Sequence, residues 1–165
     1  PDGYTTELSL RIPPWIATLG QHLERGVALI FDYGLPRAQL YHLQRTRGTL
    51  RCHFRHRAHD DPFVNVGLQD ITAWVDFTAV AEAASDAGLE VLGFATQAAF
   101  LLGSGIDASL QAAASSTLER ARHASEARRL LLPGEMGEVF KVIALGLGYD
   151  RALAGFSVRD LRGSL

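Results

Sequence analysis

The stretch "GVALIFDYG", residues Gly26–Gly34, decides the fold class of this 165-residue chain. Five apolar residues follow one another without polar alternation before Asp32, Tyr33 and Gly34 close the run. Such a run is typical of a strand buried on both faces of a parallel sheet. We therefore predict a central strand here and place the other elements around it.

A helix is predicted directly before this strand. Apolar residues recur at helical spacing between Trp15 and Leu23. Pro13 or Pro14 suits the first turn, and Gly26 suits the left-handed residue that follows the last turn. A helix that leads into a buried strand is half of a βαβ unit, which favours an α/β fold.

Strands and helices continue to alternate along the chain. The alternation predicts a mostly parallel sheet, but three good strands and one doubtful strand are few, so the sheet looks like part of a larger one. The other expected elements are a strand or extended arm at Tyr4–Ile12, a long irregular connection at Leu35–Gln69, a helix capped by Asp70 or Thr72 and ended by Gly88, a strand at Leu89–Thr96, a short helix at Gln97–Ile106, one or two Ala-rich helices at Asp107–Pro133 and a last strand at Gly137–Leu147.

Composition excludes several classes of partner. The formal net charge of −2 predicts no nucleic-acid partner. Without a run of eighteen apolar residues, no membrane partner is expected either. The first residues lack a signal-peptide pattern and a starting Met, which suggests a fragment of a longer protein. A single cysteine fits a reducing compartment such as the cytoplasm.

The stretch "RCHFRHRAHDD", Arg51–Asp61, raises the question of a metal site. His53, His56 and His59 are three residues apart, so on a helix the outer two would point about 120° apart, and on a strand they would alternate faces. Familiar zinc spacings are missing from the sequence, and neighbouring arginines would repel a cation. A substrate-facing loop or a solvated basic loop fits better, and we predict no metal.

Other catalytic motifs give weak signals. The sequence contains no phosphate-binding G-x-x-x-x-G-K-[ST] motif. Ser104 between Gly103 and Gly105 lacks the spacing of a nucleophile elbow. Cys52 has histidines nearby, but the partners of a catalytic cysteine usually lie far away in the sequence.

The end of the central strand is the first candidate site. In open α/β sheets, ligands bind beyond the carboxyl ends of the strands, where Asp32 and Tyr33 stand and where Gly34 permits a sharp turn. A turn or a cap is the alternative role of these residues. Asp70 fits a helix cap better than a catalytic role, while Glu7 could face a cationic substrate from the first extended segment.

Five blocks of the sequence carry a family resemblance. They are "GVALIFDYG", "GTLRCHFRHRAHDDPF", "GLQDITAWVDF", "TQAAFLLGSGI" and "MGEVFKVIAL". In this order they resemble the C-terminal half of the MidA-like SAM-dependent methyltransferases, which include bacterial proteins and the mitochondrial arginine methyltransferase that assists complex I assembly. The match runs from Glu7 to Leu145, and the bacterial branch is the most similar.

The resemblance implies fold and cofactor. The expected fold is the C-terminal part of a class I, Rossmann-like α/β sheet, with an antiparallel last strand and a helical insert before it. Residues 1–165 would be the C-terminal portion of one methyltransferase domain, whose N-terminal half carries the glycine-rich SAM loop. The implied cofactor is S-adenosylmethionine, and its binding residues in this chain are unknown.

The resemblance also implies a protein arginine substrate. Carboxylates hold a guanidinium bidentately, and a nearby carboxylate or histidine can take the proton that the nitrogen loses. By position in the family's motifs, the candidate catalytic residues are Glu7, Asp32, Tyr33 and His56, and the candidate substrate-binding residues are Gly34, Asp61, Asp70 and Asp76.

Two rival functions stay open. The first is a non-enzymatic interaction module or assembly factor that binds a partner through a sheet edge or its long helices. The second is a metal-dependent protein that uses the histidine cluster. The sequence does not determine the oligomeric state, and a homo-oligomer is compatible with it.

Overall fold

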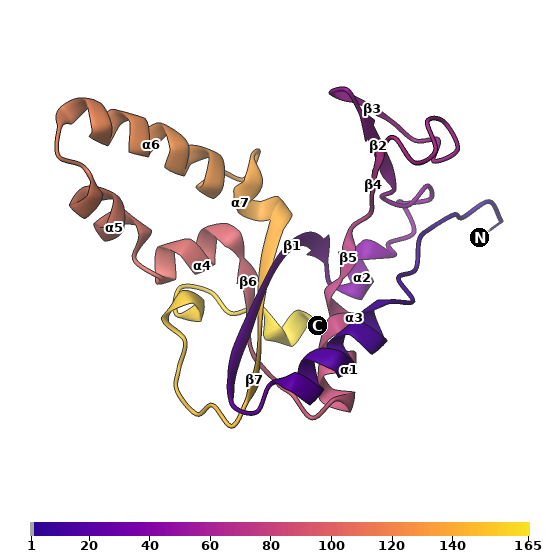
Figure 1. Cartoon of the computed structure of the whole chain (residues 1–165), viewed down its shortest axis with the longest axis horizontal. Coiled ribbons are helices and arrows are strands. Elements are labelled where there is room, and N and C mark those ends of the chain that lie inside the picture. Colours follow the sequence, from indigo (N-terminus) through magenta and orange to yellow (C-terminus); the bar gives the residue numbers. More distant parts are fainter. Residues whose placement is uncertain (1) are drawn as a thin grey trace.

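The computed structural model describes residues 2–165, which form a main sheet with helices on both faces and a separate small sheet (Figure 1). The main sheet has the strand order β5-β1-β7-β6. Its strands are β1 (Gly26–Leu35), β5 (Val75–Asp76), β6 (Glu90–Thr96) and β7 (Phe140–Leu147). The predicted α/β class and the three predicted strands at its centre are confirmed.

Three of the four strands in the main sheet run in the same direction. β7 lies between β1 and β6 and is antiparallel to both, so β1 and β6 run in the same direction. β5 pairs with β1 in parallel, and only at Gly34 and Leu35. β1, β5 and β6 thus run in one direction and only β7 opposes them, so the expected mostly parallel sheet is confirmed for the described strands. The antiparallel last strand implied by the family resemblance is confirmed.

Helices cover the two faces of the main sheet. α1 and α3 pack on one face, and α4 with a 3₁₀ turn packs on the other. The helical elements are α1 (Ile12–His22), α2 (Arg37–Leu40), α3 (Phe77–Asp86), α4 (Gln97–Gly103), α5 (Ile106–Ala113), α6 (Thr117–Leu131), α7 (Met136–Val139) and the 3₁₀ turns η1 (Ala154–Phe156) and η2 (Arg162–Ser164). None of the helices in residues 2–165 combines the length and the apolar character needed to cross a bilayer.

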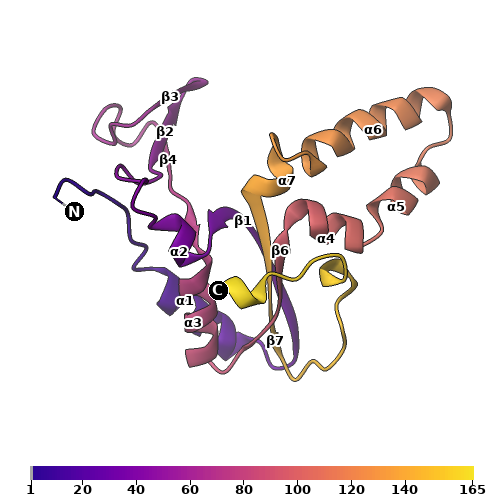
Figure 2. The same ribbon diagram turned by 180° about the vertical axis from the view of Figure 1, so that it is seen from behind.

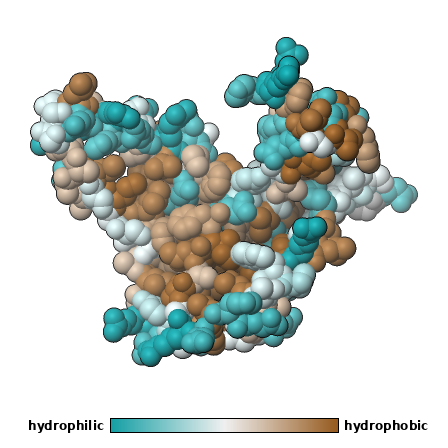
Figure 3. Space-filling view, in the orientation of Figure 1, coloured by the Kyte–Doolittle hydropathy of each residue, from teal (hydrophilic) through white to brown (hydrophobic). Residues whose placement is uncertain are grey.

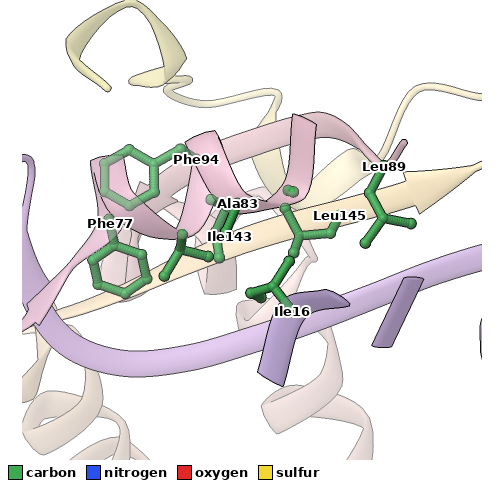
Figure 4. Close-up of a cluster of buried hydrophobic side chains, with 9 residues drawn as sticks. Ile16, Phe77, Ala83, Leu89, Phe94, Ile143 and Leu145 are labelled. Atoms are coloured by element: carbon green, nitrogen blue, oxygen red, sulfur yellow. The ribbon is translucent and has the colours of Figure 1, made fainter. Parts of the chain in front are cut away.

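The main core lies between the sheet and the pair α1 and α3 (Figure 4). Ile16, Phe77, Phe94 and Ile143 are fully buried there, and the rings of Phe77 and Phe94 lie 5.1 Å apart. Each such side chain contributes about 1.5–3 kcal/mol by its burial. The apolar side chains that recur at helical spacing in α1 form one face, and this face packs against the sheet.

The second face of the sheet is covered less completely. Phe100 of α4 contacts Phe31 and Phe156 edge-on, at 5.2 Å in both cases. Leu29 and Phe31 of β1 nevertheless remain 46% and 44% exposed. The prediction that β1 is buried on both faces is therefore wrong for this chain: its apolar run faces helices fully on one side only.

The long connection after β1 was predicted to be irregular, and this prediction is wrong. Much of it folds into a small sheet that we call the arm. Its strands are β2 (Arg51–Phe54), β3 (Arg57–His59) and β4 (Asp70–Thr72), in the order β3-β2-β4 and antiparallel throughout. Arg55 and His56 form the two-residue turn between β2 and β3, both with positive φ, as a type I′ hairpin requires. The arm projects away from the main sheet in both views (Figures 1 and 2).

Three predicted boundaries move. The segment 4–9 lies outside both sheets, although the backbone N–H of Thr5 donates a hydrogen bond to the Thr46 carbonyl at 2.9 Å. Of the two predicted forms, it is therefore the extended segment and not the strand. Gly26 begins β1 instead of capping α1, whose last turn ends at His22. α3 is capped by Asp76, whose carboxylate accepts the Ala79 N–H at 3.0 Å. The caps predicted at Asp70 and Thr72 are wrong, because both residues belong to β4.

The Ala-rich region before the last strand is two helices, α5 and α6. Ser116 caps α6 by accepting the Glu119 N–H, and the Glu119 carboxylate accepts the N–H and the hydroxyl of Ser115. These bonds hold the pKa of Glu119 below its ordinary value, and they start a new helix at this point. Both helices extend beyond the sheet on the side opposite the arm (Figure 2). The predicted helical insert is confirmed.

Candidate functional site

The carboxyl end of β1 meets the start of α3 at a very short backbone distance. Gly34 pairs with Val75, and a Cβ atom at Gly34 would lie only 2.2 Å from the Val75 carbonyl oxygen. Only glycine fits here, since the clash would be with backbone and not with a flexible side chain. The Gly34 predicted for a turn thus serves close strand pairing, which brings β1 beside Asp76.

Asp76 is buried and organises an ion cluster at this junction. Its carboxylate accepts the Arg37 Nε–H at 3.0 Å, and the two terminal nitrogens of Arg37 bind the Glu82 carboxylate at 2.7 and 2.6 Å. Hydrogen bonds to Glu82 and Asp76 raise the pKa of the Arg37 guanidinium, and the same guanidinium lowers the pKa of Glu82. Asp76 therefore fixes α2 against α3 through Arg37.

A cavity of about 250 Å³ adjoins Asp76. Tyr41 and Trp74 line it together with the carboxyl-bearing residues Glu7 and Asp76. Burial, followed by the negative charges of Asp76 and Glu7, raises the pKa of Tyr41, so its hydroxyl stays protonated at neutral pH. Aromatic walls beside two carboxylates suit a flat cationic group.

Glu7 reaches this cavity from the extended N-terminal segment. Its carboxylate accepts the backbone N–H of Thr49 at 2.8 Å and also the Thr49 hydroxyl. The hydroxyl oxygen of Thr49 in turn accepts the backbone N–H of Trp74 at 2.9 Å. Glu7 is thereby tied to the segment before the arm and to the wall of the cavity, and unused lone pairs remain on its oxygens.

A second and larger cavity, of about 740 Å³, lies at the base of the arm. Glu7 lines this cavity too, with Arg47, Arg51 and Asp60 among its other walls. Arg51 and Asp60 form an ion pair there. We favour the smaller cavity as the ligand site because it adjoins the carboxyl end of β1, where open α/β sheets bind their ligands.

Asp32 and Tyr33 lie on β1 before the cavity is reached. Asp32 is in register with Lys141 of β7, which is in register with Thr96 of β6, so the three side chains share one face. Thr96 and Lys141 are buried, and burial lowers the pKa of Lys141. The Asp32 carboxylate accepts the Tyr33 N–H at 2.8 Å, and the Tyr33 ring packs edge-on against Phe140.

The structure separates the other predicted site residues. His56 is exposed in the turn at the tip of the arm, and Asp61 is exposed and accepts the Phe63 N–H at 2.9 Å. Asp70 is exposed on β4. Of the eight predicted residues, the cavity brings together Glu7 and Asp76, and Gly34 pairs with Val75, which also lines the cavity.

Sequence reasoning missed Arg37, Tyr41 and Trp74. Trp74 stands between two predicted residues in "DITAWVDF" and could have been noticed as an aromatic beside carboxylates. Arg37 binds Asp76 across 39 positions, a separation for which a single sequence carries no pattern. Across the part of the chain that the structure describes, no three His, Cys, Asp or Glu side chains group closely enough to hold a metal ion.

A family model described as "Putative S-adenosyl-L-methionine-dependent methyltransferase" matches residues 1–95, which include this cavity and the arm. The chain belongs to this family. The resemblance drawn from the five sequence blocks is thereby confirmed.

Solved structures match the whole chain. Two crystal structures of a Burkholderia thailandensis protein, one of them bound to S-adenosyl-homocysteine, share 44% sequence identity with it at a TM-score of 0.95. The match covers 100% of this chain but only 43% and 44% of those chains. The methyltransferase-like fold is therefore shown, and the chain corresponds to less than half of these neighbours.

One curated relative adds a substrate name. The mitochondrial protein arginine methyltransferase NDUFAF7 homolog of Drosophila melanogaster is 31% identical over 144 residues. The match covers 84% of this chain and 31% of that protein. The chain thus spans about a third of the length of this relative.

Proposed function

We propose that this protein is the C-terminal portion of a SAM-dependent methyltransferase domain that methylates protein arginine side chains. The similarity of the whole chain to a structure bound to S-adenosyl-homocysteine carries the proposal. Arginine as substrate is supported by the name of the Drosophila relative and by the carboxylates and aromatic rings around the 250 Å³ cavity. The single, buried cysteine agrees with a reducing compartment such as the cytoplasm.

The cavity would act as the cradle for the substrate guanidinium. Glu7 and Asp76 each retain acceptor capacity beyond their present hydrogen bonds, and Tyr41 and Trp74 supply flat walls. Holding the guanidinium in one plane leaves one nitrogen aimed out of the cavity, and such positioning is the main source of rate in a direct transfer. The carboxylate of Glu7 or Asp76, beside the bound guanidinium, could also take the proton that the nitrogen releases.

The described residues do not by themselves fit a complete cofactor pocket. In residues 2–165, the junctions β5–α3 and β6–α4 pass directly from strand to helix, without a glycine-rich turn that could approach a nucleotide closely. When bound, S-adenosylmethionine would supply an electrophilic methyl group. We propose that residues of a longer protein, in the N-terminal half of the domain, hold most of it.

Calorimetric titration with S-adenosyl-homocysteine tests this proposal. We expect weak or undetectable binding to the 165-residue chain and clear binding to the longer protein of which we propose it is part. If that longer protein did not bind either, the methyltransferase proposal would fail, and a non-enzymatic interaction module would become the better description.

Substitutions in the longer protein test the cradle. Asp76→Asn and Glu7→Gln should raise KM for an arginine peptide while leaving the affinity for S-adenosyl-homocysteine unchanged, because these residues face the substrate in our proposal. Asp70→Asn, which changes an exposed carboxylate on β4, is the matched control. If all three variants had the same KM, the cavity would not be the site that binds the arginine side chain.

A further inference from the structure

Trp74, an aromatic wall of the 250 Å³ cavity, lies outside the regular elements of the fold. Ala73 and Trp74 connect β4 of the arm to β5 of the main sheet and belong to neither strand. The space-filling view shows the arm as a lobe that stands out from the body of the molecule (Figure 3). The position of the Trp74 ring therefore depends on the contacts that this residue makes itself.

Arg45 provides the contact to the ring. The central carbon of its guanidinium lies over the Trp74 ring, 5.2 Å from the ring centroid, which is within the range of a cation–π interaction. Arg45 stands in the turn that follows α2, where its backbone N–H donates to the His42 carbonyl at 2.8 Å. This bond fixes the point from which the arginine side chain reaches the ring.

The described residues give the Arg45 side chain no polar partner. Its Nε is buried and has no hydrogen-bond partner among them, and the ion pairs within residues 2–165 all use other arginines. A buried donor without a partner destabilises a fold, so the contact with Trp74 is what offsets this loss. Arg45 is also not among the described residues that line the cavity. Its influence on the cavity therefore passes through Trp74.

The segment that carries Arg45 also holds the other walls of the cavity. Before it, the Tyr41 hydroxyl donates to the Glu7 carbonyl at 3.4 Å. After it, Thr49 binds the Glu7 carboxylate and accepts the backbone N–H of Trp74. The bond to Thr49 fixes the backbone of Trp74 but leaves its ring free to rotate about the side-chain torsions. The guanidinium of Arg45 restricts that rotation.

We propose that Arg45 is a positioning residue for the arginine site: its guanidinium holds the indole of Trp74 as the flat wall on which the substrate guanidinium stacks. This inference rests on the proposed function, which supplies the substrate. A wall that is already in place binds a ligand more tightly than one that must first be ordered. Loss of Arg45 should therefore weaken binding of the substrate arginine and leave the transfer step and the affinity for the cofactor unchanged.

Fluorescence of Trp74 tests the positioning without any activity. The chain has two tryptophans, and Trp15 is 55% exposed on α1, so Trp15→Phe leaves Trp74 as the only emitter. In that background, Arg45→Ala should about double the amplitude of the sub-nanosecond depolarisation in time-resolved anisotropy. Arg45→Lys keeps a cation near the ring and should restore most of the original decay. Arg55→Ala is the matched control, because the Arg55 guanidinium lies over the Phe54 ring at 5.3 Å in the arm; it should change nothing.

Kinetics in the longer protein test the consequence for the substrate. Arg45→Ala should raise KM for an arginine peptide roughly 5-fold, the size expected for loss of one cation–π contact. It should leave kcat and the affinity for S-adenosyl-homocysteine unchanged, Arg45→Lys should recover most of the loss, and Arg55→Ala should match the unmodified protein.

Three results would overturn the role of Arg45: an unchanged anisotropy decay in Arg45→Ala, an unchanged KM in a protein that methylates the peptide, or an equal rise of KM in Arg55→Ala. Failure of the proposed function looks different. In that case the unmodified longer protein would methylate no arginine peptide, while the anisotropy would still report whether Arg45 holds the Trp74 ring.

Discussion

The main sheet and the arm are both built from paired strands, but different interactions stabilise them. In the main sheet, β1 and β7 pair over eight residues and bury Ile143 and Leu145 completely. In the arm, β2 pairs with β3 and with β4 over three residues each, and Cys52 is the one residue of these strands that is fully buried. Packing therefore determines the sheet, whereas turns and local hydrogen bonds determine the arm.

This difference teaches where stability and interaction reside. Removing apolar contacts from the sheet should unfold the protein, because its side chains have no alternative to each other. Removing apolar side chains from the arm should leave the fold intact, because these side chains already face water. Function that depends on exposed groups can then change in the arm at little cost to the fold.

The largest expected effect separates two phenylalanines. Phe94→Ala should lower the free energy of unfolding by about 3–5 kcal/mol, since Phe94 is fully buried against Phe77. Phe63→Ala should change it by less than about 0.5 kcal/mol, since Phe63 is 84% exposed. Urea unfolding followed by circular dichroism measures both. A loss above about 2 kcal/mol for Phe63→Ala would show that Phe63 contributes to the core.

The second effect separates two aspartates six residues apart. Asp76→Ala removes the cap of α3 and leaves Arg37 with Glu82 alone, and should cost about 1–2 kcal/mol, because Arg37 is partly exposed and screened. Asp70→Ala removes an exposed carboxylate and should cost less than about 0.5 kcal/mol. Equal losses in thermal unfolding would contradict the assignment of Asp76 as the structural residue of the pair.

The sequence predicted the main sheet well because its signal is local. An unbroken apolar run such as that of β1, or the helical spacing before it, reports burial within a few residues. The position of β7 between β1 and β6 was not predicted, because it depends on how distant strands pair and no single apolar run encodes it. The exposure of Leu29 and Phe31 was missed for the same reason, since it depends on what packs against β1 from elsewhere.

The arm escaped prediction because its strands are short and its turn is atypical. Arg55 and His56 occupy a type I′ turn, where Asn-Gly or Asp-Gly would have been the recognisable signal. A hairpin of three or four residues per strand also falls below the length at which alternation can be read. The histidines of Arg51–Asp61 therefore belong to a hairpin, with His53 and His59 on its strands and His56 in its turn.

The candidate site was predicted in part. Glu7 and Asp76 were named through the family resemblance, and the structure places both against one cavity. Arg37, Tyr41 and Trp74 were not named, because each joins the site through a contact made by folding. His56 and Asp61 carried the same resemblance yet lie in the arm, so a family match fixes position in the fold but not membership of one site.

The smallest expected effect concerns the buried charge of the main sheet. Lys141 is the only lysine of the chain, and its ammonium donates to the carbonyl oxygens of Glu138 and Val139 at the end of α7. Burial lowers the pKa of Lys141 below its ordinary value of 10.5, so between the two values the unfolded chain binds more protons than the folded protein. The free energy of unfolding contributed by this group therefore rises as the pH increases through that window. Lys141→Met should flatten the pH dependence of unfolding on the approach to pH 10.5, whereas Arg57→Met, which removes an exposed charge of the arm, should leave it unchanged. Urea unfolding at a series of alkaline pH values measures the slopes, and equal slopes for unmodified protein and Lys141→Met would mean that the buried lysine titrates as if it were in water.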